Sequence, residues 1–324
     1  MSNLDNKRTS QYKKNATHEN VLKSMNEALL PVEKQLVQNF SMPKHPIIFI
    51  VGAQRSGTTL LMQLIAQLFD VSYPTNFIAR YWNAPYIGAT LYKNLSSQLE
   101  HKELDLQSDL GYTKGLQGPH EFGYFWKRWF PWESWETPQY EKIDYSLLQK
   151  ELSAWQSVNN TPLVFKNLII LNSNIEFLAK IFPNSFFINI ERESVFNCQS
   201  TYQSRLKLFG NEKEWFGVKP PEYLEISKMP IFEQIVYQLF YIRNNIKNQL
   251  EKLEITRYET IKYENLIKNY NQILEDLFYK IFKQKRVFNN DIKLVNGNKV
   301  SVAQSIFDKF LSLCENIFGN EKDN

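Results

Sequence analysis

Apolar residues gather along the chain in short blocks, and their spacing changes from one block to the next. Residues 47–51 read IIFIV, a continuous apolar run that is typical of a strand buried on both faces of a parallel sheet. Residues 58–69 place leucine or isoleucine on one broad face at helical spacing, which predicts an amphipathic helix. The pattern therefore predicts a buried strand that passes at once into a helix.

The same alternation continues over most of the chain. Two more short apolar runs, residues 162–165 and 186–190, predict buried strands, with a crossover helix over residues 174–182 between them. Later blocks predict helices over residues 194–209, 231–253 and 266–282, and a broken strand over residues 255–263. Strands that alternate with helices indicate an α/β fold with a central parallel sheet and right-handed crossovers.

Other segments do not follow this alternation. Residues 1–20 are polar and predict a flexible N-terminus, whereas residues 21–40 favour an amphipathic helix that Pro31 interrupts. Residues 70–160 form a long insertion between the first helix and the second strand, and we expect much of the acceptor side of a site there. Residues 296–301 predict a turn followed by a polar tail. We therefore expect a single domain over residues 21–324.

Composition narrows the class of protein. The 324 residues are 43% hydrophobic, enough for a sizeable core, and the formal net charge of +4 favours one anion site over a nucleic-acid surface. Cys198 and Cys314 are too few for a disulfide framework, and with four scattered histidines they predict no metal site. A polar N-terminus, and apolar runs shorter than about 18 residues, predict a cytoplasmic protein without a membrane span.

The first segment that indicates a function is the loop GAQRSGTT, residues 52–59. After a buried strand, the backbone N–H groups of a glycine-containing turn and the start of the next helix can hold a tetrahedral anion. Gly52 and Gly57 match the spacing of the nucleotide triphosphatase loop, but Thr58 stands where that loop has a lysine. Arg55 supplies a cation instead, and no acidic Mg²⁺ ligand follows nearby. The pattern favours an anionic group that needs no metal.

The loop resembles the 5′-phosphosulfate loop of sulfotransferases that use 3′-phosphoadenosine 5′-phosphosulfate (PAPS). Its Arg-Ser-Gly-Thr-Thr form is that of bacterial, glycan and tyrosylprotein members. The family's second signature, an arginine at a strand end and a serine eight residues later, is matched by Arg192 and Ser200. Residues 262–266, KYENL, are similar to a third and weaker family stretch.

The resemblance implies a P-loop-like three-layer fold, with a helical, aromatic-rich insertion, that transfers a sulfuryl group without metal. PAPS would be the donor, adenosine 3′,5′-bisphosphate the product, and a hydroxyl or amine the acceptor. The resemblance assigns the 5′-phosphate and sulfonyl group to Gly52, Arg55, Ser56, Gly57, Thr58 and Thr59. It assigns the 3′-phosphate to Arg192 and Ser200, with Lys299 of a late basic loop as a further candidate; an exposed turn lysine is the alternative for Lys299.

Sulfuryl transfer needs cations near the leaving oxygen and a base for the acceptor proton. Arg55 is the first cation, and Lys166, at a strand end, matches a lysine that the family often carries; a solvated lysine is the alternative. The positions where the family usually has its base hold no glutamate and, at Leu168, no histidine. Glu121 is the preferred substitute and His120 the second. In the alternative, His120 caps a helix and Glu121 pairs with a surface arginine.

The acceptor is not specified by the sequence. Residues 124–135, YFWKRWFPWESW, predict either an aromatic platform for the acceptor or, for most of their side chains, the core of the insertion. A glycan, a lipid or a small metabolite would fit, and peripheral membrane contact stays open. Two other functions stay open too. A nucleotide-dependent kinase would need a loop lysine and Mg²⁺, and a non-catalytic anion-binding protein would tolerate loss of Glu121.

Overall fold

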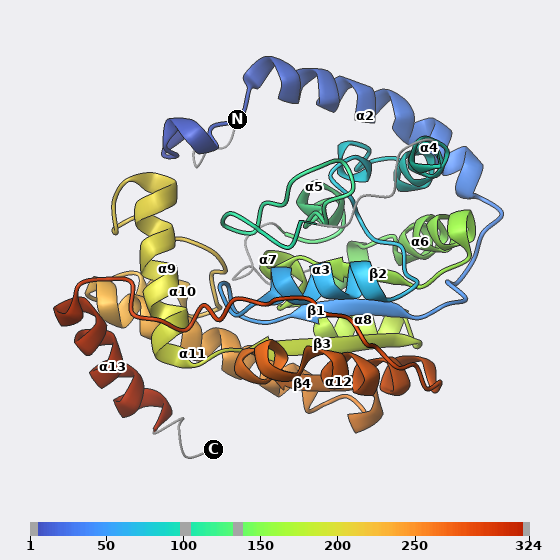
Figure 1. Ribbon diagram of the computed structural model, residues 1–324. Coiled ribbons are helices and arrows are strands. Elements are labelled where there is room, and N and C mark those ends of the chain that lie inside the picture. Colours follow the sequence, from blue (N-terminus) through green and yellow to red (C-terminus); the bar gives the residue numbers. More distant parts are fainter. Residues whose placement is uncertain (1–5, 98–104, 132–138, 320–324) are drawn as a thin grey trace.

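The computed structural model describes residues 6–97, 105–131 and 139–319 (Figure 1). Within these residues the core is a parallel sheet in the order β2-β1-β3-β4. The strands are β1 (Ile47–Val51), β2 (Leu163–Lys166), β3 (Ser185–Glu191) and β4 (Tyr258–Lys262). Phe49 in the central strand lies opposite Phe165 of β2 and Phe187 of β3. The predicted central parallel sheet is confirmed.

Both faces of β1 are buried, as its continuous apolar run predicts. Ile47, Phe49 and Val51 belong to one hydrophobic cluster, and Ile48 and Ile50 belong to the other. Helices α3 (Thr58–Leu68) and α12 (Tyr263–Phe282) cover the second face. The first face is covered by α6 (Tyr145–Asn159), α7 (Leu168–Leu171), α8 (Ile175–Ile181) and α11 (Ile231–Leu250). These helices and the sheet make the predicted three layers.

Most predicted elements agree with the structure to within a few residues. The predicted broken strand over residues 255–263 divides into the short helix η4 (Ile255–Arg257) and strand β4. Helix α9 (Ser194–Phe209) ends at Gly210, whose φ of +74° suits a helix C-terminus. It is followed by the short helix α10 (Tyr223–Ile226) and then by α11.

The insertion between α3 and β2 is helical, as predicted. It contains η2 (Ile78–Arg80), α4 (Pro85–Ser96), α5 (Gly123–Trp126), η3 (Tyr140–Lys142) and α6. Phe125, Trp126 and Phe130 are buried in the core, whereas Tyr124 is exposed. The core interpretation of the aromatic stretch is therefore right for these three rings, and residues 132–135 lie outside the described residues.

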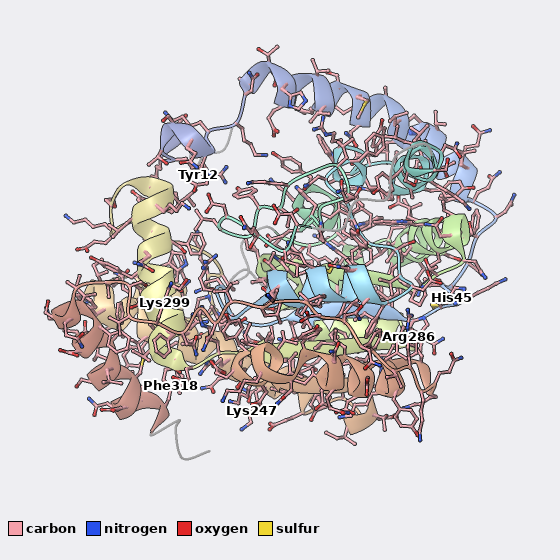
Figure 2. All side chains as sticks on the ribbon, viewed as in Figure 1. Tyr12, His45, Lys247, Arg286, Lys299 and Phe318 are labelled. Atoms are coloured by element: carbon pink, nitrogen blue, oxygen red, sulfur yellow. The ribbon has the colours of Figure 1, made fainter. Side chains whose placement is uncertain are left out.

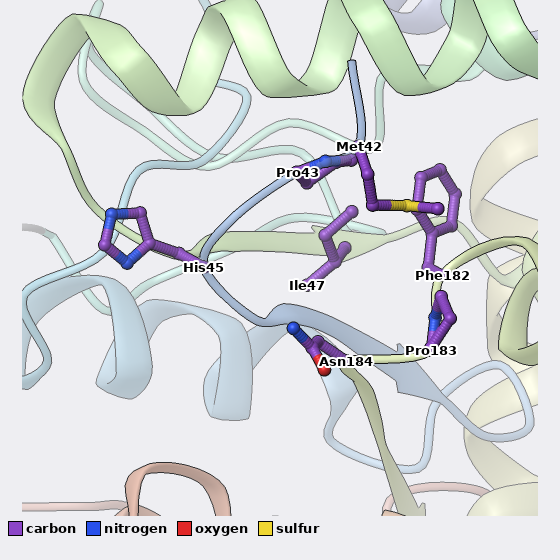
Figure 3. Close-up of a pocket in the computed structure, with 7 residues that line it drawn as sticks. All are labelled: Met42, Pro43, His45, Ile47, Phe182, Pro183 and Asn184. Carbon is purple, nitrogen blue, oxygen red and sulfur yellow. The ribbon is translucent and has the colours of Figure 1, made fainter.

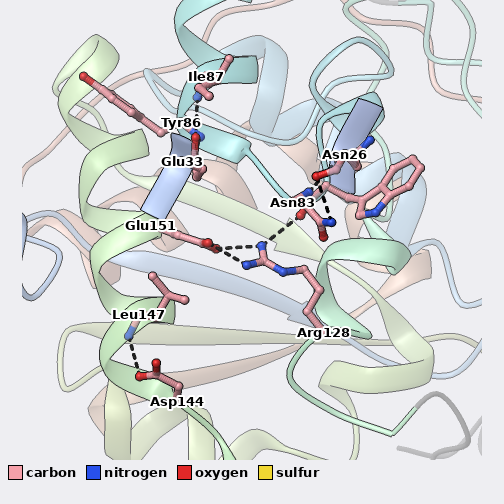
Figure 4. A network of polar contacts seen from close by, with 10 residues as sticks. Asn26, Glu33, Asn83, Tyr86, Ile87, Arg128, Asp144, Leu147 and Glu151 are labelled. Carbon is pink, nitrogen blue, oxygen red and sulfur yellow. Dashed lines mark hydrogen bonds and ion pairs between the residues drawn. The ribbon is translucent and has the colours of Figure 1, made fainter. Parts of the chain in front are cut away.

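A buried polar network joins the insertion to the N-terminal helix (Figure 4). Arg128 donates to both carboxylate oxygens of Glu151, at 2.9 and 2.7 Å, and to the carbonyl oxygen of Trp82. Glu33 of helix α2 (Ala16–Val37) accepts from the N–H groups of Tyr86 and Ile87 at the start of α4. Burial raises the pKa of Glu33 to about 7. These contacts join α2 to α4, and they join α6 to the segment after α5 and to Trp82 before α4.

The N-terminal part is more structured than the sequence predicts. Residues 6–20 include η1 (Ser10–Tyr12) and the start of α2 (Ala16–Val37), whose first turn is capped by Asn15 accepting from His18 N–H. Helix α2 continues through Pro31, because a proline removes only one helix hydrogen bond and Glu33 and Val37 anchor the following turns in the protein. No helix in residues 6–97, 105–131 or 139–319 is long and apolar enough to cross a membrane.

The C-terminal part also differs from the prediction. Helix α13 (Gln304–Phe318) occupies the segment for which the sequence predicted a polar tail, so that prediction is wrong. Phe307, Phe310 and Cys314 recur at intervals of three and four and are buried in the core that α9 and α11 also line. This apolar face, on an otherwise polar helix, is the signal that the sequence interpretation missed.

Candidate functional site

The loop between β1 and α3 depends on its two glycines. Gly52 and Gly57 have φ values of +147° and +103°. A β-carbon at Gly52 would lie 2.7 Å from the carbonyl oxygen of Ile190, and one at Gly57 would lie 2.6 Å from Cδ2 of Tyr263. The loop can take this path only because these positions have no side chain.

Neighbouring side chains hold the loop in place. Asn172 accepts from Gly52 N–H at 3.2 Å and donates to Gly52 carbonyl oxygen at 2.8 Å. Ser56 Oγ donates to the carbonyl oxygen of Ala53, so its hydroxyl is used inside the loop. Thr58 and Thr59 occupy the first turn of α3, where backbone N–H groups lack helix partners and attract anions.

Two arginines meet beside this loop. Arg55 Nε donates to Ser200 Oγ at 2.9 Å, and Arg192 donates to the carbonyl oxygen of Arg55 at 3.1 Å. Burial lowers the pKa of both arginines, and the charge of Arg192 lowers the pKa of Arg55 further. An anion placed between the two guanidinium groups would stabilise their charged forms and so raise both pKa values. The structure thus brings together Arg55, Arg192 and Ser200, which we call the arginine pair with its serine.

A late loop closes over Arg192. Its guanidinium donates to Asn298 Oδ1 at 2.7 Å and to the carbonyl oxygen of Gly297 at 2.6 Å, and its charge lies 4.9 Å from the ring centre of Tyr263. The carbonyl oxygen of Lys299 accepts from Gln199 of α9, while the Lys299 side chain is exposed (Figure 2). The late loop therefore contacts this site through the backbone of Gly297 and Lys299 and the side chain of Asn298.

Sequence reasoning missed part of this arrangement. Glu264 accepts from the N–H of Glu193 at 3.0 Å and from the side-chain amide of Asn298 at 2.7 Å. Tyr263 contacts Gly57 and accepts from Gly297 N–H at 2.9 Å. The stretch KYENL was the available signal, and its tyrosine and glutamate join the late loop to the glycine loop.

A second group of polar side chains lies at the start of α3. Lys166, at the carboxyl end of β2, donates to Thr59 Oγ1 at 2.9 Å and pairs with Glu121 Oε1 at 2.6 Å. The Lys166 side chain is 5% exposed and that of Glu121 is 40% exposed. Lys166 is therefore not a solvated lysine, and Glu121 does not pair with an arginine. We call Thr59, Lys166 and Glu121 the Lys166 cluster.

His120 lies next to this cluster but has a different environment. Its Nδ1 accepts from the N–H of Phe122 at 2.8 Å, which assigns the ring hydrogen to Nε2. Loss of hydration lowers the pKa of His120, although the residue keeps exposed surface, so the neutral form is favoured at neutral pH. His120 thus holds the N–H of Phe122, the residue before α5, which is a structural contact but not the helix cap that the alternative named.

Residues with a strained backbone lie beside the glycine loop and the Lys166 cluster. Among the described residues, five non-glycine residues have left-handed φ values: Arg55, Leu110, Phe122, Asn160 and Lys283. The last two end helices, where that conformation is common. The first three border the glycine loop and the Lys166 cluster. Strain of this kind is typical of functional sites, which supports the location of the site.

A hollow elsewhere on the molecule lacks this chemistry (Figure 3). It lies at the amino end of β1 and is lined by Met42, Pro43, His45, Ile47, Phe182, Pro183 and Asn184. In α/β folds of this type, ligands bind at the carboxyl ends of the strands. The glycine loop and Lys166 are at those ends, so we place the site there.

Known proteins share this sequence pattern. Residues 46–281 match the model of the sulfotransferase family. The chain is 25% identical over 247 residues to the Omega-hydroxy-beta-dihydromenaquinone-9 sulfotransferase Stf3 of Mycobacterium bovis. That alignment covers 68% of the chain and 59% of the relative, so the match spans less than two thirds of the relative's length.

Solved structures share the fold. Sulfotransferase STF9 from Mycobacterium avium superposes with a TM-score of 0.51 at 13% identity, covering 89% of this chain and 72% of that one. STF1 from Mycobacterium tuberculosis gives 0.51 at 11% identity, covering 88% and 81%. The family match spans most of the chain and contains the glycine loop, the arginine pair with its serine and the Lys166 cluster. The chain therefore belongs to the sulfotransferase family.

Proposed function

We propose that this chain transfers a sulfuryl group from PAPS to a hydroxyl or amine of an organic acceptor. The observation that carries the proposal is the placement of two groups of charged side chains beside one loop. The arginine pair with its serine lies on one side of the loop, and the Lys166 cluster lies at the start of α3. One group suits the phosphates of a donor and the other suits a reacting centre.

The donor would lie across the glycine loop. The N–H groups of the first turn of α3, with Thr58, Thr59 and Arg55, would hold the 5′-phosphate and the sulfonyl group. Arg192 and Ser200 would hold the 3′-phosphate. Arg192 now donates to neutral oxygens of Gly297 and Asn298. A phosphate would be a stronger acceptor because it is charged.

In the proposed step, the acceptor oxygen forms a bond to sulfur while the bond from sulfur to the bridging phosphate oxygen breaks. The electron pair of the broken bond stays on that oxygen, where Arg55 and Lys166 neutralise the developing charge. The acceptor proton passes to the Glu121 carboxylate. Lys166 contacts both Thr59 and Glu121 and so joins the donor side to the base.

For the acceptor we propose a lipid-like or small molecule with a free hydroxyl. The name of the mycobacterial relative describes a hydroxylated menaquinone, which is an apolar molecule of this kind. Exposed rings near Glu121 support the proposal, because Tyr112 and Tyr124 are 52% and 41% exposed. Aromatic faces accommodate apolar chains and sugar rings alike, so a glycan fits less specifically.

We also propose that the protein acts in the cytoplasm. Cys198 and Cys314 are buried thiols whose sulfur atoms lie 3.9 Å apart. Two cysteines in 324 residues are too few for the disulfide framework of a secreted protein, which supports this location.

The donor site predicts stabilisation by adenosine 3′,5′-bisphosphate in the presence of EDTA. At about 100 times the dissociation constant, the expected gain in the free energy of unfolding is about 2.7 kcal/mol, because the ligand binds only the folded state. Thermal unfolding measures this gain with the bisphosphate in EDTA. Adenosine 5′-phosphate in EDTA, and MgATP in a buffer without EDTA, are measured for comparison. Stabilisation by MgATP alone would favour a kinase.

A pair of variants tests the assignment of the 3′-phosphate. Arg192→Ala should lose the preference for the bisphosphate over adenosine 5′-phosphate, because it removes a charge-assisted contact to the 3′-phosphate. Arg286→Ala is the matched control, since Arg286 is exposed and carries the same charge. If Arg192→Ala keeps the preference of the control, the 3′-phosphate lies elsewhere.

A further inference from the structure

A tight turn lies directly over the Lys166 cluster. Asp109 and Tyr112 exchange backbone hydrogen bonds of 2.9 and 2.8 Å across Leu110 and Gly111. A β-carbon at Gly111 would lie 3.6 Å from Glu121 Oε1, 3.7 Å from Lys166 Nζ and 3.7 Å from Thr59 Oγ1. The backbone of this turn therefore borders all three members of the cluster.

The turn is strained and needs support from outside. Leu110 has a φ of +51° and Gly111 a φ of +91°. The left-handed conformation is unfavourable for a bulky residue such as leucine, and it persists where surrounding contacts impose it. The contacts of Asp109 provide this support.

Asp109 is held from two directions. Its Oδ2 accepts from Tyr12 Oη at 2.7 Å, and its Oδ1 accepts from Lys207 Nζ at 2.5 Å. The rings of Tyr12 and Tyr112 also stack, with centres 6.4 Å apart. The carboxylate thus connects the turn to the N-terminal segment and to α9.

The N-terminal segment is itself anchored on α9. Thr9 N–H donates to the carbonyl oxygen of Leu208 at 2.9 Å, and Lys7 pairs with Glu214 at 2.9 Å. We call residues 7–12 the N-terminal strap, and Figure 2 shows Tyr12 beside the end of α9. The same helix carries Ser200, so the strap and the arginine pair share a support.

We propose that Asp109 is a positioning residue that, with Tyr12 and Lys207, closes the turn 109–112 over the Lys166 cluster. The N-terminal strap then forms the outer wall of the acceptor side. The inference rests on the proposed function and deepens it. The closed turn shields Lys166 and keeps bulk water from the donor, so the sulfuryl group reaches the acceptor. In an open state, a water oxygen would bond to sulfur while the bond from sulfur to the bridging phosphate oxygen breaks. Sulfate and adenosine 3′,5′-bisphosphate would leave, and the two water protons would pass to solvent or to the bisphosphate.

Tyr12→Phe tests the closure, because it keeps the stacked ring and removes the donor to Asp109. Loss of one hydrogen bond to a carboxylate should raise the open fraction about tenfold, equivalent to about 1.4 kcal/mol. The modification of Lys166 by an amine-reactive acetyl ester, followed by mass spectrometry, should accelerate by that factor. Asp109→Asn should act in the same direction, and Tyr279→Phe, at an exposed tyrosine, should change nothing.

A second measurement separates closure from mere folding. Without acceptor, Tyr12→Phe and Asp109→Asn should hydrolyse PAPS to sulfate faster than the wild type. The proposal is overturned if Lys166 is modified at the wild-type rate in both variants. It is also overturned if Lys166 is modified faster while PAPS is hydrolysed at the wild-type rate. If the wild type fails to bind adenosine 3′,5′-bisphosphate, the proposed function is wrong. The Lys166 modification rate would still decide whether Asp109 holds the turn closed.

Discussion

Replacing Glu121 by glutamine is expected to slow sulfuryl transfer by about 10²–10⁴-fold, which is the usual effect of removing a general base. Glutamine keeps an oxygen that can accept from Lys166, so the contact of the cluster survives while the proton acceptor is lost. The affinity for adenosine 3′,5′-bisphosphate should therefore stay unchanged. Turnover under saturating PAPS and acceptor, together with bisphosphate titration, measures the two effects separately.

His120→Ala is the control for this assignment. The Nδ1 atom of His120 already accepts from Phe122 N–H, so the histidine is not placed to take the acceptor proton through that atom. We expect a small loss of rate for His120→Ala compared with Glu121→Gln. A larger loss for His120→Ala would transfer the role of base to the imidazole, and near-normal turnover of Glu121→Gln would remove Glu121 from the mechanism.

Replacing Glu151 by alanine is expected to lower the free energy of unfolding by about 3–5 kcal/mol, because it leaves a buried charge without its partner. The Glu151 side chain is 0% exposed and that of Arg128 is 15% exposed. Without the carboxylate, the guanidinium keeps the carbonyl oxygen of Trp82 as its one hydrogen-bond acceptor among the described residues, beside the rings of Phe125 and Trp129. Urea unfolding at neutral pH measures the loss.

An exposed ion pair supplies the comparison. Glu176→Ala breaks the ion pair of Glu176, 45% exposed, with Lys252, 62% exposed. It should lower the free energy of unfolding by no more than about 1 kcal/mol. If Glu151→Ala costs no more than Glu176→Ala, the Arg128 pair does not hold the insertion in place. Normal bisphosphate binding by a destabilised Glu151→Ala protein would show that the network supports the fold and not the donor site.

Features that depend only on neighbouring residues in the chain could be predicted from the sequence. A strand such as β1, buried on both faces, needs a continuous apolar run, and a glycine loop that approaches Ile190 and Tyr263 needs glycine at residues 52 and 57. Arg192 and Ser200 were found through the resemblance, because they match the family's arginine at a strand end and serine eight residues later. The same reasoning placed Lys166 at the edge of the sheet where the site lies.

Other features depend on contacts between distant residues. Lys166 meets Glu121 across 45 positions of sequence, and Tyr12 meets Asp109 across 97, so no local pattern reveals either pair. The polar residues of the N-terminal segment bond to Asp109, Glu214 and the backbone of α9, and such partners leave no hydrophobic pattern in the sequence. Helix α13 is a different case, since its apolar face could have been recognised from the sequence.

The most direct test of the central claim is the fate of radioactive sulfur in PAPS. Purified protein should be incubated with labelled PAPS, EDTA and hydroxyl-bearing lipid and small-molecule fractions of a cell extract. The label should enter an organic product, and an equal amount of adenosine 3′,5′-bisphosphate should form. Tight binding of the bisphosphate with no transfer to any fraction would contradict the central claim and would identify a non-catalytic binding protein.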